Sequence, residues 1–254
     1  MRRFLLALTL LLLPTATWAQ SRLDEIVARG TLRVALTGDY RPFSFLDKAT
    51  GQYTGLDVDM ANNLAESLGV KLEIVPTTWS TLLADLKGDK FDVGMGGISV
   101  NLARQKTAFF SAPVLRVGKT PIARCADKAR FQTLAQIDRP GVRVIVNPDG
   151  TNEKFDRANL KQATIVTFPD NTKIFEELVA KRADVMITDS VETKLQQKLH
   201  PELCAIHPDQ PFDYGELAYL LPRDLPLRQY VNQWLHLAME NGTWRQRLES
   251  YLGR

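Results

Sequence analysis

The stretch Arg182-Ala-Asp-Val-Met-Ile-Thr-Asp-Ser-Val-Glu192 decides the fold expected for this chain. Its apolar run predicts a short buried strand over residues 184–188, followed at once by a helix. Asp189 is a residue type that often precedes a helix, and Glu192 has the spacing of a capping box. In an open α/β sheet, ligands usually bind where a strand's carboxyl end meets a helix's first turn. The two carboxylates therefore have two interpretations: they cap the helix, or one orients a ligand and the other is an acid in the pocket.

Alternating strand and helix patterns continue on both sides of this stretch, as in a parallel sheet with crossover helices. The other expected strands are 31–36, 72–75, 91–95, 142–146, 164–168 and 217–221, and the expected helices are 23–29, 57–68, 78–86, 131–137, 153–160, 171–180 and 225–251. The alternation is interrupted after residue 111 and again over 203–214. We therefore expect a two-lobed α/β fold, each lobe a mainly parallel sheet flanked by helices, with two hinge crossings and a ligand cleft between the lobes. Lobe one is expected at 22–117 and 214–254, and lobe two at 118–213.

Residues 1–19 have the pattern of a secretory signal peptide. Two arginines precede an apolar run over 4–13, which is too short to cross a bilayer, and the segment ends at Ala19. Its removal takes away two arginines and no acidic residue, so the net charge falls from +3 to +1. This charge gives no argument for binding nucleic acid or an anionic membrane. We expect export to the periplasm and no stable membrane insertion after cleavage.

Cys125 and Cys204 are the two cysteines of the chain. A disulfide is the default in an oxidising compartment, and a bridge between these positions would tie together the base of lobe two. Their spacing fits no metal or thioredoxin motif, and the histidines have no ligand spacing. The sequence contains no P-loop, G-x-G-x-x-G, G-x-S-x-G or H-E-x-x-H motif. These absences disfavour the corresponding enzyme classes, and we expect no metal site.

Two further segments favour an anionic ligand. Arg104 follows the glycine-rich turn at 96–97, where its guanidinium could bind a carboxylate through two hydrogen bonds; the alternative is a solvated surface arginine. Residues 147–153 lead into a helix whose first backbone N–H groups can bind an anion; the alternative is a plain turn with Thr151 as the N-cap. Tyr40 is expected as an exposed aromatic residue in a turn-rich loop.

Several segments resemble the periplasmic amino-acid-binding proteins of ABC transporters. They are Gly96-Gly-Ile-Ser-Val-Asn-Leu-Ala-Arg104, Phe110-Ser-Ala-Pro113, Gly150-Thr151 and Ala183-Asp-Val-Met-Ile-Thr-Asp189. The resemblance covers essentially the whole mature chain and implies a periplasmic binding protein fold. It also implies amino-acid contacts from Tyr40, Ser99, Arg104, Thr151 and Asp189. In that family the aromatic ring covers the ligand side chain, the arginine binds the carboxylate, and the aspartate binds the ammonium. The chain departs from the family at 101–104, where Asn-Leu-Ala-Arg replaces the common Thr-Pro-Glu-Arg.

A second set of segments is similar to the periplasmic cyclohexadienyl dehydratases, relatives of the binding proteins that act as enzymes. They are Val146-Asn-Pro-Asp-Gly-Thr-Asn-Glu-Lys-Phe155, Arg157-Ala-Asn-Leu-Lys161, Asp170-Asn171, Leu199-His-Pro-Glu-Leu-Cys204 and Gln210-Pro-Phe-Asp213. The resemblance implies decarboxylating dehydration of prephenate to phenylpyruvate and of arogenate to phenylalanine, with no cofactor. It also implies that Glu192 is the general acid and that Trp79, Asn147, Asn152 and Lys173 lie in the same pocket.

From both sets we assign roles to individual residues. Catalytic roles are expected for Glu192, Asn152 and Lys173, and substrate-binding roles for Tyr40, Trp79, Ser99, Arg104, Asn147, Thr151 and Asp189. Burial beside Asp189 would raise the pKa of Glu192 by desolvation and by like charge, so that the acid keeps its proton near neutral pH. The expected partner is a small dicarboxylate, and the related enzymes suggest self-association. The alternative is a transport binding protein for an amino acid, in which Glu192 would have no role.

Overall fold

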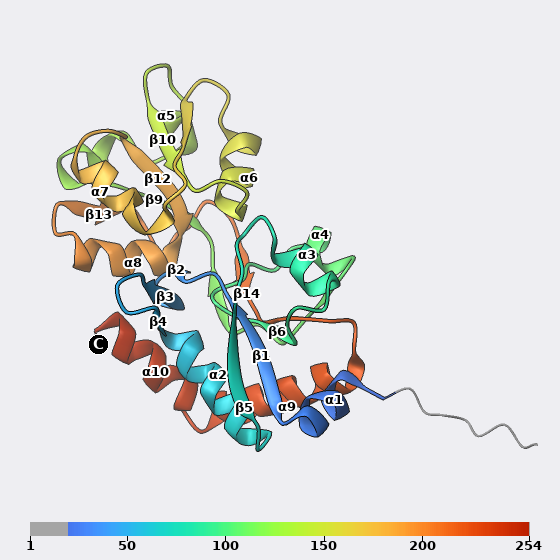
Figure 1. The fold of residues 1–254 in the computed structure, drawn as a ribbon. Coiled ribbons are helices and arrows are strands. Elements are labelled where there is room, and N and C mark those ends of the chain that lie inside the picture. The colour runs from blue at the N-terminus through green and yellow to red at the C-terminus, as the bar shows by residue number, and fades with distance from the viewer. Residues whose placement is uncertain (1–19, 254) are drawn as a thin grey trace, which may run out of the picture.

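The computed structural model has two lobes, drawn one above the other in Figure 1, and each lobe contains a five-stranded sheet. The structure describes residues 20–253, so the predicted signal peptide lies outside the described residues. Each sheet has parallel strand pairs on one side and antiparallel pairs on the other. Helices flank both sheets. The two-lobed α/β fold expected from the sequence is confirmed.

Lobe one contains the first strand of the chain. The strands of its sheet, in spatial order, are β5 (Lys71–Pro76), β1 (Thr31–Leu36), β6 (Val93–Gly94), β15 (Leu220–Leu221) and β7 (Phe109–Phe110). Its helices are α1 (Arg22–Arg29), α2 (Leu56–Ser67), α3 (Leu82–Lys87), α4 (Leu102–Gln105), α9 (Leu225–Glu240) and α10 (Thr243–Leu252). A small antiparallel sheet consists of β2 (Asp39–Tyr40), β3 (Ser44–Asp47) and β4 (Gln52–Thr54). In Figure 1 this small sheet lies against lobe two, so it is placed to shape the cleft.

The packing of α2 shows how the sequence pattern produces this lobe. Met60 and Leu64 lie one helical turn apart and are fully buried. They belong to the same apolar cluster as Leu32 and Val34 of β1. Burying one large aliphatic side chain contributes about 1.5–3 kcal/mol. The helix ends just before Gly69, whose φ of +67° is a conformation that glycine adopts without strain.

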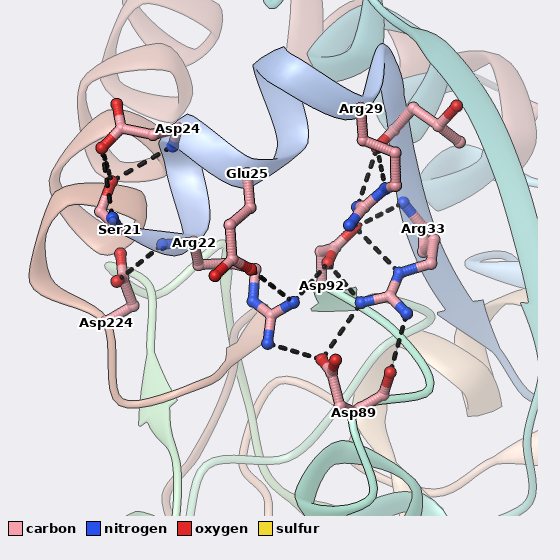
Figure 2. Close-up of polar contacts among 10 residues, drawn as sticks. Ser21, Arg22, Asp24, Glu25, Arg29, Arg33, Asp89, Asp92 and Asp224 are labelled. Carbon is pink, nitrogen blue, oxygen red and sulfur yellow. Dashed lines mark hydrogen bonds and ion pairs between the residues drawn. The ribbon is translucent and has the colours of Figure 1, made fainter. Parts of the chain in front are cut away.

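An ion-pair network joins α1, β1 and the loop before β6 at the end of lobe one farthest from lobe two (Figure 2). The fully buried Asp92 pairs with Arg29 at 2.5 Å and with Arg33 at 2.8 Å. Arg33 also donates its backbone N–H to Asp92 Oδ2 at 2.8 Å. The more exposed Asp89 pairs with Arg22 at 2.5 Å and with Arg33 at 3.1 Å. Because a buried carboxylate is unfavourable unless it is paired, the two arginines compensate for the burial of Asp92 at the base of the lobe.

Lobe two contains the stretch from which the fold was predicted. The strands of its sheet, in spatial order, are β11 (Thr164–Thr167), β10 (Arg143–Val146), β12 (Val185–Asp189), β9 (Lys119–Arg124) and β13 (Leu203–Ala205). Its helices are η1 (Cys125–Arg130), α5 (Leu134–Ile137), α6 (Thr151–Asn159), η2 (Asn171–Lys173), α7 (Ile174–Val179) and α8 (Ser190–Leu199). The expected disulfide between Cys125 and Cys204 is present, with an S–S distance of 2.02 Å. It joins the residue directly after β9 to the middle residue of β13, the neighbouring strand of the sheet.

The two crossings between the lobes run side by side. β8 (Leu115–Val117) pairs antiparallel with β14 (Gly215–Leu217), and Val117 lies opposite Gly215. Directly after β8, Gly118 approaches the returning chain closely: a Cβ atom there would lie 2.2 Å from the carbonyl oxygen of Asp213. Because only glycine fits this approach, the sequence helps to hold the two crossings together.

Several expectations for individual elements differ from the structure. The strand expected over 217–221 is replaced by the end of β14 and by β15, which belong to different sheets, and the terminal helical region consists of α9 and α10. Strand β13 lies in the segment 203–214, which was expected to be irregular. The helix expected from residue 78 begins at Leu82, because Thr78 and its neighbours form hydroxyl hydrogen bonds among themselves. The helix expected from residue 131 begins at Leu134, after a capping box at Thr133. Strand β9 was not expected, because Gly118 and Pro121 are turn or strand-breaking signals. This last omission matters most, since β9 supplies a residue of the site.

Candidate functional site

Hydrogen bonds between the lobes surround a pocket at the carboxyl ends of the strands. Tyr40 donates its hydroxyl to Asp189 Oδ2 at 2.7 Å. The hydroxyls of Ser99 and Thr151 lie 3.1 Å apart. Asn171 donates its amide to the backbone carbonyl of Asp39 at 3.0 Å. Each of these contacts joins a residue of lobe one to a residue of lobe two, so the lobes are closed on one another.

Seven of the residues assigned from the sequence line this inner pocket: Tyr40, Trp79, Ser99, Asn147, Thr151, Asn152 and Asp189. The space left between the lining side chains is about 20 Å³. This is less than a small ligand requires, so binding needs movement of the lobes or of these side chains. Tyr40 was expected to be exposed, but it is buried: its ring packs beside Phe43 and Trp79, and its hydroxyl bonds to Asp189 of lobe two.

The glycine turn after β6 positions the lobe-one side of the pocket. The N–H groups of Gly96 and Gly97 donate to the buried carboxyl of Asp57 at 2.8 and 2.9 Å. Gly97 has a φ of +74°, and a Cβ atom there would lie 2.5 Å from the Tyr40 ring. Glycine is therefore required both by the turn and by the aromatic side chain beside it. The turn leads directly to Ser99.

Trp79 and Tyr40 form the aromatic wall of the pocket. Their ring centroids are 6.0 Å apart in an edge-on arrangement. Trp79 donates its indole N–H to Asp39 Oδ1 at 3.0 Å. Burial raises the pKa of Asp39, and this indole hydrogen bond opposes the effect. The carboxyl group of Asp39 therefore lies behind this wall, where it also lines a second, outer pocket.

Arg104 is a buried cation whose only hydrogen-bond partner from its side chain, in the described part of the chain, is a carbonyl. The residue is 6% exposed, and its Nη1 donates to the Ser99 carbonyl at 2.8 Å. Within residues 20–253 it forms no ion pair with a carboxylate. Burial without a counter-ion lowers its pKa to about 10, so the guanidinium is still charged at neutral pH. The solvated-surface interpretation is wrong, and a buried unpaired guanidinium favours an anionic ligand.

Lys119, the first residue of β9, is a site residue that the sequence analysis missed. It is 6% exposed, and its ammonium lies 2.7 Å from Asp189 Oδ1. The same ammonium donates to Asn152 Oδ1 at 2.6 Å and to Thr151 Oγ1 at 3.3 Å. The sheet register places Lys119 directly opposite Asp189. A basic residue opening an apolar run at 121–123 was the signal that could have found it.

The helix-capping interpretation of Asp189 and Glu192 is wrong. Asp189 is the N-cap of α8, but its side chain makes no capping hydrogen bond. Its two oxygens accept hydrogen bonds from Lys119 and Tyr40 instead. Thr151 is not the N-cap that the alternative interpretation expected, because Gly150 is the N-cap of α6 and the Thr151 hydroxyl faces Ser99.

Glu192 lies in the first turn of α8 and is 2% exposed. Thr188 donates its hydroxyl to Glu192 Oε2 at 2.6 Å. Burial raises the pKa of Glu192 to about 8; Asp189 and Asp39 add to the rise, while Thr188 and Lys119 oppose it. The acid is therefore mostly protonated at neutral pH.

The structure divides the remaining assigned residues between two neighbouring spaces. Glu192 and Lys173 line an outer pocket of about 470 Å³, which also includes Asp39 and Asn171. Asn171 lines both pockets, so the two adjoin. Lys173 is exposed at this outer pocket. Arg104 lies beside a third depression, which shares Trp79 with the inner pocket.

Two amide oxygens beside these pockets have no hydrogen-bond partner within residues 20–253. They are Oδ1 of Asn147 and Oδ1 of Asn171, and both are buried. A buried acceptor without a donor is unfavourable, so each is suited to receive a hydrogen bond from a ligand. The same part of the chain contains no cluster of three or more His, Cys, Asp or Glu residues able to hold a metal ion. None of its helices has the length and apolar character required to cross a membrane.

Comparison with known proteins identifies the family. Residues 32–254 match the family model of bacterial extracellular solute-binding proteins, family 3. The chain belongs to this family. Within it, the chain is 60% identical over 233 residues to a cyclohexadienyl dehydratase of Pseudomonas aeruginosa, covering 92% of this chain and 87% of that protein.

Two solved structures of this solute-binding family are also similar. One is an ancestral amino-acid-binding protein described as a precursor of cyclohexadienyl dehydratase, with 37% identity and a TM-score of 0.84 over 91% of this chain and 100% of that one. The other is an ancestral cyclohexadienyl dehydratase, with 52% identity and a TM-score of 0.60 over 93% of this chain and 98% of that one. The solute-binding family therefore includes both amino-acid binders and dehydratases close to this chain.

Proposed function

We propose that this protein is a cyclohexadienyl dehydratase, a lyase that converts prephenate to phenylpyruvate and L-arogenate to L-phenylalanine. The observation that carries the proposal is the buried, protonated carboxyl of Glu192 beside the interlobe pocket. A protein that only binds a solute has no need of a neutral acid there. The high identity to a dehydratase over most of the chain supports the same activity.

In the proposed reaction, Glu192 protonates the ring hydroxyl as it leaves. The C–O bond breaks with its electron pair on oxygen, and the proton from Glu192 completes a water molecule. The bond from the ring to its carboxylate breaks in the same step, CO₂ departs, and the released electron pair completes the aromatic ring. General acid catalysis of this kind typically contributes about 10²–10⁴-fold.

Two buried cations suit a dicarboxylate. Arg104 lacks an anionic partner in the described structure and is proposed to bind the carboxylate of the substrate side chain. Lys119, already hydrogen-bonded to Asn152, is proposed to stand beside the ring carboxylate or the leaving oxygen. Tyr40 and Trp79 provide flat faces for the ring, and Lys173 adds a cation at the outer pocket.

The transport alternative is disfavoured by the pairing of Asp189. In an amino-acid binder of this type, the aspartate is expected to pair with the ligand ammonium. Here the Lys119 ammonium lies against Asp189 Oδ1, and the Tyr40 hydroxyl donates to Oδ2. A ligand ammonium would have to displace one of these partners. This arrangement favours the keto acid prephenate over a ligand with an ammonium group, and arogenate would have to displace one of these partners as an amino acid would.

Location and assembly are further parts of the proposal. Its members are extracellular solute-binding proteins, and we propose that this chain acts in the periplasm after loss of residues 1–19. Its ligand is an amino-acid-like small molecule, which we propose to be a dicarboxylate. Self-association is also proposed, and light scattering of the purified protein tests it.

The test is turnover of prephenate by the purified chain at pH 7–8, followed by the absorbance of phenylpyruvate in alkali. A no-enzyme control is required, because acid alone aromatises prephenate. We expect rapid turnover by the native chain and loss of about 10²–10⁴-fold in Glu192→Gln, with ligand binding retained. Tight amino-acid binding without any turnover of prephenate or arogenate would instead establish the transport function.

A further inference from the structure

We propose that Thr188 is a positioning residue that holds the acidic proton of Glu192 on Oε1. This inference rests on the proposed dehydratase function. It follows from a chain of hydrogen bonds that begins at Lys119 and passes through Asn152 and Thr188 to Glu192. Donor and acceptor roles along such a chain determine one another, because each group has a fixed number of protons.

The first link fixes the orientation of the Asn152 amide. An ammonium group can only donate, and the Lys119 ammonium lies 2.6 Å from one terminal atom of Asn152. That atom must therefore be the amide oxygen. The NH₂ group of Asn152 then faces Thr188, and its Nδ2 lies 2.9 Å from Thr188 Oγ1.

The second link fixes the hydroxyl of Thr188. The residue is fully buried, and its Oγ1 accepts from Asn152 Nδ2. Its own proton needs an acceptor, and in the described part of the chain Glu192 Oε2 is the acceptor within hydrogen-bond distance, at 2.6 Å. If Glu192 donated to Thr188 instead, the Thr188 hydroxyl proton would be buried without a partner, which is unfavourable.

The third link places the acidic proton. Glu192 Oε2 accepts from Thr188, so a neutral carboxyl must carry its proton on the other oxygen, Oε1. Within residues 20–253, Oε1 makes no hydrogen bond that would hold its proton away from a substrate. After Glu192 gives up that proton, the bond from Thr188 is made to a carboxylate and becomes stronger. Thr188 thus directs the proton and also stabilises the conjugate base.

The charged groups around Glu192 set the conditions for a test. Asp189 and Asp39 raise its pKa, whereas Lys119 and the Thr188 hydroxyl lower it. Removing only the hydroxyl therefore raises the pKa further while the three charged groups stay in place. Without the hydroxyl, the proton of Glu192 is no longer held on Oε1 and the acid is weaker, so kcat should fall. Because the pKa of Glu192 rises, the basic limb of the pH–rate profile should move to higher pH.

The experiment compares Thr188→Val, which keeps the shape but loses the hydroxyl, with Thr188→Ser, which keeps the hydroxyl. We expect Thr188→Val to lower kcat about tenfold, a part of what a general acid contributes, with KM within about twofold. Its basic limb should move to higher pH, and Thr188→Ser should restore most of both properties. Thr193→Val is the matched control, because Thr193 is a buried threonine on the helix that carries Glu192 and its hydroxyl donates to the Ser190 carbonyl. In that control, kcat should stay within about twofold of the native value and the basic limb should stay at the same pH.

An infrared difference spectrum between the native chain and Glu192→Gln provides a second readout. The carbonyl stretch of protonated Glu192 should move to higher frequency in Thr188→Val, because Oε2 loses its hydrogen bond. An unchanged kcat, basic limb and carbonyl stretch in Thr188→Val would overturn the inference, as would failure of Thr188→Ser to restore them. Full activity in Glu192→Gln would instead remove the proposed role of the acid itself, so the two failures are distinguishable.

Discussion

Replacement of Glu192 by glutamine should make the protein more stable while it lowers turnover by about 10²–10⁴-fold. The native carboxyl is fully buried and takes its proton at a pH far above the ordinary value, because the closed lobes exclude water. Glutamine keeps the size of the side chain and an oxygen that can accept from Thr188, but it has no acidic proton. The substitution therefore removes the cost of burying an acid together with the acid's chemistry.

The size of the stability change follows from proton linkage. The pKa of Glu192 is raised from 4.5 to about 8, so its contribution to stability is fully present below pH 4.5 and is lost as the pH rises toward 8. At pH 7 the unfolded chain has released this proton and the folded chain retains it. The difference of roughly 2.5 pH units corresponds to about 3 kcal/mol. Glu192→Gln should recover up to that amount, and most of it should disappear at pH 5.

The size of the kinetic change follows from the same pKa. With a pKa of about 8, roughly 90% of Glu192 carries its proton at pH 7, compared with roughly 0.3% at the ordinary value of 4.5. Burial therefore provides about 300-fold more active acid at neutral pH. Between pH 7 and pH 9 the protonated fraction, and with it kcat/KM for prephenate, should fall about tenfold.

Denaturant unfolding at pH 5 and pH 7 measures the stability change, and a pH–rate profile from 7 to 10 measures the acid. Glu176→Gln is the matched control, because Glu176 lines the same outer pocket but is exposed. It should change neither stability nor rate by more than a small amount. The reasoning fails if Glu192→Gln is less stable than the native chain at pH 7, or if the native profile lacks a basic limb near pH 8.

Three other perturbations test the remaining features. Arg104→Met should raise KM for prephenate roughly 50-fold in steady-state kinetics, since a charge-assisted hydrogen bond is worth about 2–3 kcal/mol. Arg157→Met, on the exposed rim of the same depression, should leave KM unchanged. The Cys125→Ser, Cys204→Ser double variant should lose about 4 kcal/mol of unfolding free energy, because the bridge closes a loop with a sequence separation of 79; a reductant should destabilise only the native chain. Asp92→Asn should lose about 2 kcal/mol in denaturant unfolding, because it removes the buried carboxylate that accepts from Arg29 and Arg33, and a loss smaller than 1 kcal/mol would contradict this estimate.

The fold was predictable because its main elements have strong local patterns. The apolar run before Asp189, the helical spacing of Met60 and Leu64, and the glycine after α2 each agree with the tertiary structure. Elements without such agreement were predicted less well. β9 contains Pro121 and follows Gly118, and only its pairing with β12 and β13 makes it a strand. Because strand pairing is a tertiary property, a single sequence gives little warning of it.

The site was predictable in its residue types and less so in its geometry. The spacing of Asp189 and Glu192 suits a helix cap as well as a pocket, and the structure decides between them through Lys119, which lies 70 positions away in the sequence. Likewise, no local pattern distinguishes the buried Arg104 from a surface arginine. The assigned residues were expected to line a single pocket, but Glu192 and Lys173 line the outer pocket and not the inner one. These distinctions depend on how the two lobes meet, which no local pattern contains.

Pairing of Lys119 with Asp189 changes the expected cause of the acid's behaviour. Like charge from Asp189 was expected to raise the pKa of Glu192 together with burial. The Lys119 ammonium, 2.7 Å from Asp189, opposes that charge. Burial is therefore the main reason that Glu192 keeps its proton. Part of the remaining rise comes from Asp39, which lies in lobe one while Glu192 lies in lobe two. Since water exclusion and Asp39 both act only when the lobes are together, the closed cleft and the protonated acid stabilise one another.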